Sequence, residues 1–132
     1  MPFGRRVYGL GVMALGIVCL AWGDFDPGQP VPKYFPDRTA FDTAVAAELR
    51  TRGVELVCLA GFMRLIGPPL LEAFPQAILN IHPSLLPAFP GMDAQAQAIA
   101  HGVKVSGATV HFVTGQLDAG PIILQSAVRV EH

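Results

Sequence analysis

An asparagine and a histidine two residues apart, Asn80 and His82, carry the clearest chemical potential in this sequence. In an extended segment, side chains two residues apart point to the same side, so both groups can face one ligand. Histidine is the usual general acid or base near neutral pH, and an asparagine amide can donate a hydrogen bond to a developing oxyanion. Asp118 follows in a later loop and could hold and charge the imidazole if the fold brings it near. The spacing alone leaves open a second interpretation, in which these are three polar residues at strand and loop ends.

Other polar and large side chains favour structural roles on sequence grounds. His111 lies inside an alternating, β-branched stretch, residues 109–113, where a hydrogen-bonded structural histidine is expected. Arg64 is expected to be solvated, and Met63 and Leu65 to pack around a strand end. Neither the cysteines nor the histidines have the spacing of metal ligands, so we expect no metal site.

Short apolar strands that alternate with helices are expected to position these side chains. Alternating strands and helices predict an α/β fold with an open, mainly parallel, Rossmann-like sheet. In such sheets ligands bind beyond the carboxyl ends of the strands, and the Asn80–His82 pair lies at one such end. The expected elements are a helix over residues 37–52, strands over 54–60, 77–81, 108–113 and 122–130, a short helical turn over 70–74, and a helix over 93–101 capped by Asp93.

Length and composition narrow the classes of function. The 132 residues fit one domain, and a hydrophobic share of 52% excludes a disordered chain. The charged share of 14% is low, against about 25% in a typical domain. Nine basic and ten acidic side chains give a net charge of −1, so no field of one sign attracts nucleic acid or an anionic membrane. We therefore expect neither a nucleic-acid partner nor a membrane partner.

The first thirty residues differ in composition from the rest. A basic start, an apolar centre and small residues make residues 5–23 typical of a signal peptide. The apolar stretch is short for a membrane span, which needs about 20 apolar residues. A buried strand followed by a turn is the alternative interpretation. Prolines and glycines in residues 24–36 predict a linker, and we treat residues 1–30 as an atypical apolar segment with a Pro/Gly linker.

Four motifs in order make the sequence resemble the phosphoribosylglycinamide formyltransferases of purine biosynthesis. The likeness runs from about Val31 to Val130, with the spacing kept throughout. The motifs are residues 57–66 (VCLAGFMRLI), 79–87 (LNIHPSLLP), 109–113 (TVHFV) and 117–125 (LDAGPIILQ).

The resemblance implies a reaction and roles for individual residues. A formyl group passes from the co-substrate 10-formyltetrahydrofolate to the amine of glycinamide ribonucleotide through a tetrahedral intermediate, without a metal. Asn80 and His82 match the residues that stabilise the intermediate and shuttle protons, and Asp118 matches a carboxylate that favours the charged histidine. The folate-binding residues implied by the resemblance are Arg38, Met63, Arg64, Leu65, Ile66, Asn80, Thr114, Gly115, Gln116, Leu117 and Asp118.

The resemblance ends short of the family pattern on both sides. The family opens with a strand and a glycine-rich loop that cradles the substrate phosphate, and nothing before Val31 matches that loop. The family also continues past Val130 into a helix, whereas this sequence stops at His132. We therefore interpret residues 31–132 as a partial formyltransferase catalytic domain, truncated at both ends.

Two alternatives stay open beside the transferase. One is a truncated, inactive, folate-binding remnant, and the other is a hydrolase like formyltetrahydrofolate deformylase, which passes the formyl group to water. Residues 62–64 and 83–87 favour the glycinamide enzyme over the hydrolase. The expected partners are its two small-molecule substrates, and the sequence leaves the oligomeric state open. A folate-dependent purine enzyme is expected in the cytoplasm, which conflicts with the signal-like pattern of residues 5–23.

Overall fold

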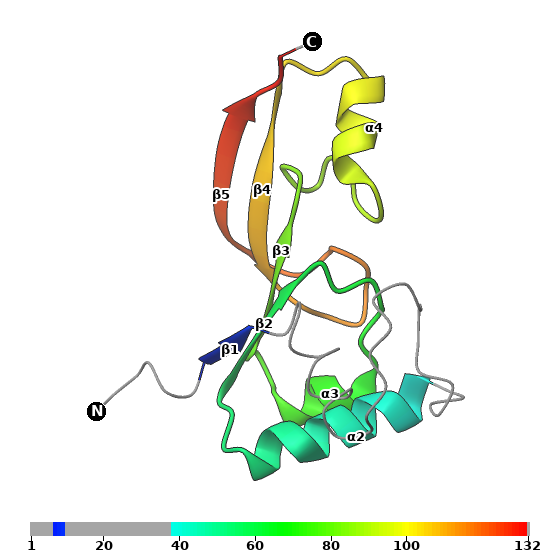
Figure 1. The fold of residues 1–132 in the computed structure, drawn as a ribbon, viewed down its shortest axis with the longest axis vertical. Coiled ribbons are helices and arrows are strands. Elements are labelled where there is room, and N and C mark those ends of the chain that lie inside the picture. The colour runs from blue at the N-terminus through cyan, green and yellow to red at the C-terminus, as the bar shows by residue number, and fades with distance from the viewer. Residues whose placement is uncertain (1–6, 10–37, 132) are drawn as a thin grey trace, which may run out of the picture.

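One mixed sheet and three helices make up the described part of the chain in this computed structural model, residues 7–9 and 38–131. Helices α2 and α3 lie at one end of the molecule, and α4 lies at the other, beside β4 (Figure 1). The strands, in their order across the sheet, are β1 (Val7–Gly9), β2 (Leu56–Ala60), β3 (Ile78–His82), β4 (Val105–Phe112) and β5 (Ile122–Arg129), and the helices are α2 (Arg38–Thr51), α3 (Pro68–Ala73) and α4 (Ala94–Ala100).

The direction of the strands changes in the middle of the sheet. β1, β2 and β3 run parallel, whereas β4 pairs antiparallel with both β3 and β5. The expected open α/β sheet is confirmed, but its pairs divide equally between the two directions, so the sheet is mixed and not mainly parallel. The reason lies in the connection: α4 lies beyond the end at which β3 leaves the sheet, so β4 enters from that same end (Figure 1).

Most expected elements form near their expected limits. The helix expected over residues 37–52 is α2, and the last strand but one begins earlier than expected, at Val105. The side-chain cap expected from Asp93 was wrong: Asp93 precedes α4 in a left-handed conformation and makes no cap hydrogen bond through its side chain. Residues 7–9 form a strand, as the alternative interpretation of the N-terminal segment expected, and the other residues before Arg38 lie outside the described part.

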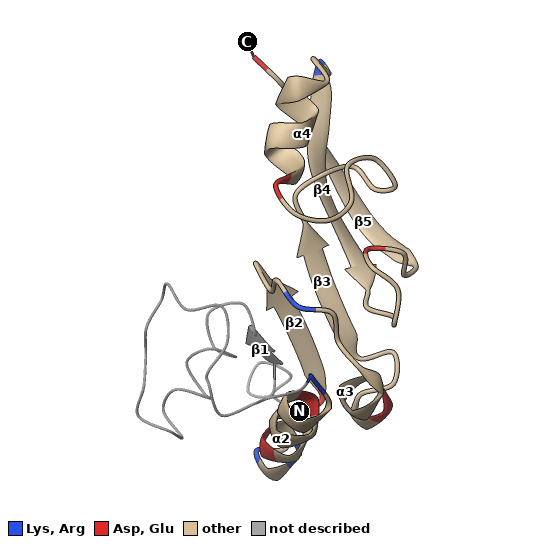
Figure 2. Ribbon diagram, turned by 90° about the vertical axis from the view of Figure 1, so that its right-hand side faces the viewer, with Lys and Arg blue, Asp and Glu red and all other residues tan. Residues whose placement is uncertain are grey.

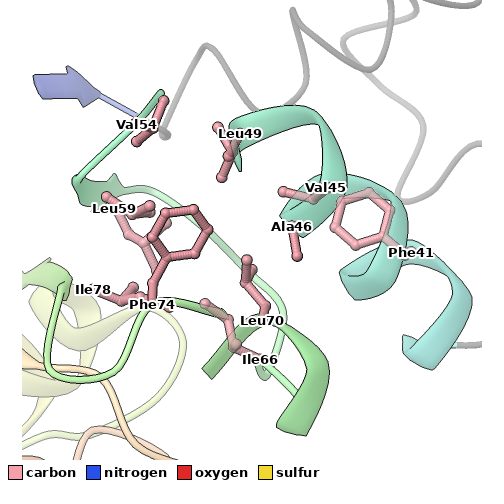
Figure 3. Packing of buried hydrophobic residues seen from close by; sticks show 11 residues of the cluster. Phe41, Val45, Ala46, Leu49, Val54, Leu59, Ile66, Leu70, Phe74 and Ile78 are labelled. Carbon is pink, nitrogen blue, oxygen red and sulfur yellow. The ribbon is translucent and has the colours of Figure 1, made fainter. Parts of the chain in front are cut away.

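A single apolar core joins α2 and α3 to the parallel part of the sheet (Figure 3). Alternating residues of β2, Val57 and Leu59, are buried on one face, and Ile78 at the start of β3 continues this core. The other members of the core are Phe41, Val45, Ala46, Leu49, Val54, Ile66, Leu70 and Phe74. This packing fixes where β3 starts, and therefore where its later residues lie.

The opposite edge of the sheet is exposed and apolar. β5 is exposed along its whole length, with Leu124 and Val128 more than half accessible to solvent. Several charged residues lie along α2, at the other end of the molecule (Figure 2). Among residues 7–9 and 38–131, no helix is both long enough and apolar enough to cross a membrane.

A buried carboxylate ties α2 to the loop that follows β2. Asp42 is 1% exposed, and its Oδ2 accepts a hydrogen bond from the backbone N–H of Gly67 at 2.5 Å. Burial raises the pKa of the Asp42 carboxyl above its ordinary value, although the Gly67 N–H and the positive charges of Arg64 and Arg38 oppose this. A Cβ on Gly67 would lie 2.7 Å from the same oxygen, so the contact also requires glycine there.

We expect Asp42→Asn to be at least as stable as the wild type at pH 7, and Asp42→Ala to be about 1–3 kcal/mol less stable. The asparagine keeps an acceptor for Gly67 and removes a buried charge, whereas the alanine leaves the N–H unpaired. Because the folded-state pKa is raised, the contribution of Asp42 to stability falls as the pH rises through that pKa. Urea unfolding of the three proteins between pH 4 and about pH 7 measures both effects. Equal losses in the two variants at pH 7 would show that attraction to the arginines outweighs the burial cost.

Candidate active site

Beyond the core, the same face of the sheet becomes polar. Asn80 and His82 alternate with Ile78 on β3, so they share its face. On β4, His111 lies opposite Asn80 and Thr109 lies opposite His82. Residues paired across antiparallel strands point to the same side, and His82, Thr109 and His111 are each less than 5% exposed. The sheet therefore gathers four polar side chains next to the apolar core.

Each ring nitrogen of His82 faces an acceptor. Nε2 lies 2.8 Å from the carbonyl oxygen of Phe89, and a carbonyl can only accept, so Nε2 carries a proton. Nδ1 lies 3.4 Å from Oδ2 of Asp118, and both side chains are less than a tenth exposed. Two acceptors fit the doubly protonated, positively charged ring, which can add positive charge to a reacting centre or give up a proton.

The Asp118 carboxylate is anchored by the backbone of a distant loop. Its residue has a left-handed conformation, with φ of 47°, and its Oδ2 accepts the N–H of Gly91 at 2.7 Å. Gly91 has φ of 82°, which favours glycine. The other oxygen, Oδ1, lies 3.7 Å from Nε2 of His111. The structure thus brings Asp118 to His82, as the sequence-based hypothesis required.

His111 is the member of this cluster that sequence reasoning placed elsewhere. It is buried and hydrogen-bonded, as expected of a structural histidine, but its partners belong to the site. Nδ1 lies 2.9 Å from the Phe112 carbonyl oxygen, and Nε2 lies 3.3 Å from Nδ2 of Asn80. Knowing that His111 pairs with Asn80 across β3 and β4 would have placed it in the site, but one sequence alone does not specify this register.

Thr109 is a second residue that sequence reasoning missed. Its hydroxyl donates to the Ser84 carbonyl at 2.7 Å and accepts the N–H of Leu86 at 3.0 Å. Gln125 on β5 also donates to it, at 3.0 Å. These bonds hold residues 84–86 against the sheet, and the same loop then supplies the Phe89 carbonyl to His82.

The segment after β2 that was expected to bind folate lies against the start of α2. Met63 and Leu65 are exposed, whereas the side chain of Ile66 is buried in the core, so only its backbone can face a ligand. The guanidinium carbon of Arg64 lies 4.2 Å from the centre of the Phe41 ring. Nη1 of Arg64 is buried and has no hydrogen-bond partner among the described residues.

The other expected folate residues lie on separate elements. Arg38 is the exposed first residue of α2, and its Nε would lie 3.8 Å from a Cβ on Gly67, so it belongs near the Arg64 segment. Thr114, Gly115, Gln116 and Leu117 lie in the loop between β4 and β5, where the Thr114 hydroxyl accepts the N–H of Gln116 at 3.3 Å. Leu117 is exposed, and only Asp118 of this loop reaches the polar cluster. Folate binding by these residues stays a prediction.

The cluster suits acid–base chemistry. Among residues 7–9 and 38–131, no three His, Cys, Asp or Glu side chains form a group that could hold a metal ion. The chain supplies an amide donor, an imidazole and a carboxylate within one site. These groups can stabilise a developing oxyanion and move a proton. Fold and site together define an α/β protein with a candidate site for group transfer or hydrolysis at a carbonyl carbon.

Comparison with known proteins identifies the family. Residues 24–132 match the family model described as formyl transferase. The chain belongs to the formyl transferase family, and the resemblance seen in the four sequence motifs is confirmed.

Several similar proteins are named phosphoribosylglycinamide formyltransferase or glycinamide ribonucleotide transformylase. Phosphoribosylglycinamide formyltransferase of Bacillus subtilis (strain 168) is 54% identical over 101 residues, which cover 76% of this chain and 52% of that protein. The crystal structure of glycinamide ribonucleotide transformylase 1 from Symbiobacterium toebii has a TM-score of 0.75 and 65% identity, over 76% of this chain and 48% of that one. The crystal structure of phosphoribosylglycinamide formyltransferase from Bacillus halodurans has a TM-score of 0.76 and 37% identity, over 95% of this chain and 79% of that one. The chain spans about half the length of the phosphoribosylglycinamide formyltransferases of Bacillus subtilis and Mycobacterium tuberculosis that it matches.

The loop that carries Asp118 is expected to depend on Gly120. A Cβ at this position would lie 1.7 Å from the Phe112 carbonyl oxygen, whereas a Cβ at Gly115 in the same loop would meet nothing within 4 Å. We expect Gly120→Ala to lower the free energy of unfolding by about 2 kcal/mol or more, and Gly115→Ala to change it by about 0.5 kcal/mol or less. Urea unfolding of both variants measures the difference, and equal values would contradict the close approach.

Proposed function

We propose that this chain transfers a formyl group from 10-formyltetrahydrofolate to the amine of glycinamide ribonucleotide. The buried His82–Asp118 pair beside Asn80, in a chain of the formyl transferase family, is the observation that carries the proposal. The names of the relatives supply the acceptor: the B. subtilis protein is a phosphoribosylglycinamide formyltransferase. Purine biosynthesis, the folate co-substrate and a location in the cytoplasm follow as parts of the same proposal.

In the proposed reaction, the substrate amine attacks the formyl carbon, and the formyl oxygen gains negative charge. Asn80 donates a hydrogen bond from its Nδ2 group to this oxygen, and the charged ring of His82 stabilises it electrostatically. The attacking amine must lose a proton, and the departing folate nitrogen must gain one. The charged His82 ring gives a proton to the departing nitrogen, and the Asp118 carboxylate, whose Oδ2 lies 3.4 Å from Nδ1 of His82, accepts the proton of the amine and passes it to the ring.

The folate part of the proposal is supported by an unpaired donor. Nη1 of Arg64 is a buried nitrogen without a partner among the described residues, and such groups in native proteins usually pair with an acceptor. An acceptor group of the folate would satisfy it. Exposed Met63 and Leu65 flank Arg64 and offer apolar surface to a ring system. In this proposal the eleven residues named from the resemblance form the folate site, with Asn80 and Asp118 shared between binding and catalysis.

We expect Asp118→Asn to lower turnover by about 10²-fold or more, because the amide cannot take a proton or hold the charged form of His82. Asp93→Asn is the matched control: Asp93 makes no side-chain cap hydrogen bond, so turnover should not change. The assay follows formylated glycinamide ribonucleotide with both substrates saturating. Formate release that does not need the ribonucleotide would identify a hydrolase, and folate binding without any product in the wild type would identify an inactive remnant.

We expect Arg64→Gln to weaken binding of the folate donor by about tenfold or more, because a charged hydrogen bond is lost. Arg52→Gln is the control, since Arg52 pairs with Glu48 on the exposed side of α2. Titration calorimetry with the folate donor and no second substrate measures the Kd directly. Equal affinities for wild type and Arg64→Gln would remove Arg64 from the proposed folate site and leave the catalytic cluster untouched.

A further inference from the structure

His111 is a buried titratable group for which the proposed reaction has no use. It is 2% exposed and lies directly across the β3–β4 pairing from Asn80. Its ring has three polar neighbours: the Phe112 carbonyl oxygen at 2.9 Å from Nδ1, and Asn80 Nδ2 at 3.3 Å and Asp118 Oδ1 at 3.7 Å from Nε2. The nitrogen that carries a proton can donate a hydrogen bond to its neighbour, and the nitrogen without one can only accept.

The Phe112 carbonyl fixes the tautomer of the ring. A carbonyl oxygen can only accept, so Nδ1 of His111 must carry a proton to make this contact. A neutral ring then has a lone pair on Nε2, and this lone pair accepts a hydrogen from Nδ2 of Asn80. The opposite orientation of the Asn80 amide would place Oδ1 against the same lone pair, which is repulsive. The neutral ring therefore fixes which end of the Asn80 amide faces it.

Asp118 does not compete strongly for a proton on Nε2. The 3.7 Å between Nε2 and Oδ1 is too long for a hydrogen bond, whereas Asn80 lies within reach. The Asp118 carboxylate is already paired through Oδ2 with the Gly91 N–H and with His82. A second proton on His111 would also take away the acceptor of the Asn80 amide. The neutral ring is thus the form that satisfies both the Phe112 carbonyl and the Asn80 amide.

The carbonyl that sets the tautomer is itself held in place. The Phe112 N–H donates to the Pro121 carbonyl at 2.9 Å, and Gly120 packs so closely on the Phe112 carbonyl that no Cβ fits. The pairing of β4 with β5 shifts beside His111: Val110 pairs with Leu124 and His111 with Ile122, so Ile123 of β5 is the extra residue of a bulge next to the site. The orientation of the His111 ring is therefore built into the backbone around it.

We propose that His111 is a positioning residue: as a neutral ring protonated on Nδ1, it holds the Nδ2 group of Asn80 so that the second hydrogen of that group donates to the formyl oxygen. The inference rests on the proposed function for the role of Asn80. It adds a residue that acts through Asn80 and does not itself touch the substrate. It also assigns different charges to the two buried histidines, with His82 positive and His111 neutral.

Nitrogen NMR of the full chain, labelled with ¹⁵N-histidine and without substrates, tests the tautomer directly. We expect His111 near neutral pH to show a protonated Nδ1 and an unprotonated Nε2. The exposed His101, whose Nδ1 lies 3.0 Å from the Gln97 carbonyl, serves as an internal reference for a surface ring. A proton on Nε2 of His111, in either the other tautomer or the charged form, would overturn the proposal.

Two amide substitutions of His111 separate positioning from folding. Glutamine places its amide near the position of Nε2 and can still accept from Asn80, whereas asparagine reaches only the position of Nδ1. We expect His111→Asn to lower kcat by about tenfold, with the KM values of both substrates changed less than about twofold, and His111→Gln to restore most of kcat. Rates are compared per folded molecule, with the folded fraction taken from urea unfolding. Equal kcat values for wild type and His111→Asn would overturn the positioning role.

The two experiments also distinguish failure of this inference from failure of the proposed function. If the wild-type chain shows no formyl transfer, the kinetic comparison falls away, but the tautomer and the Asn80 side-chain amide resonances still report the interaction. We expect those amide resonances to move in His111→Asn and to stay near their wild-type positions in His111→Gln. The same displacement in both variants would contradict the orientation of Asn80 by His111, whatever the chain catalyses.

Discussion

The site depends on one buried carboxylate and on how its charge is paired. Asp118 has a side chain 9% exposed, and a charge so far from water is costly unless it is compensated. The Gly91 N–H and the His82 ring both approach Oδ2, the first by a hydrogen bond and the second at ion-pair distance. Each of the two comes from a different element, the loop after β3 and the end of β3 itself. Pairing the charge therefore brings the β4–β5 loop onto the face that carries Asn80.

The division of β3 between core and site explains how such a cluster stays rigid. Ile78 is anchored in the packing of α2, α3 and β2, and the alternation of the strand then delivers Asn80 and His82 to the same face. Thr109, opposite His82, adds hydrogen bonds that hold the following loop to the sheet. The apolar core thus stabilises the start of β3, and this fixes the positions of the polar side chains that follow on the same strand. At the polar end, burying the side chains costs free energy unless they are hydrogen-bonded, and backbone N–H and carbonyl groups supply these hydrogen bonds.

The sequence predicted the parts of this arrangement that have a local signal. The helix that became α2, the short apolar strands and the alternation of Asn80 with His82 are all encoded in neighbouring residues, and the four motifs identified the family. The antiparallel direction of β4 was not predicted, because it depends on where α4 lies relative to the end of β3. The place of His111 depends on the register of β4 against β3, which side-chain spacing within one strand does not specify. The Phe89 carbonyl and the Gly91 N–H could not be predicted either, because a backbone group has no residue type to reveal it.

The two buried histidines differ because of the backbone groups that face them. Both rings have one nitrogen on a carbonyl oxygen, of Phe89 for His82 and of Phe112 for His111, so each must carry a proton there. The second nitrogen faces a carboxylate in one case and an amide N–H in the other. A carboxylate is a suitable partner for a protonated ring nitrogen and an amide N–H is a suitable partner for an unprotonated one, so the contacts of the two rings differ in kind. One site can therefore hold a proton donor on the His82 ring and a hydrogen-bond acceptor on the His111 ring. In the proposed reaction, the oxyanion donor Asn80 and the proton carrier His82 both lie on β3 opposite residues of β4, so the chemistry depends on the register of these two strands.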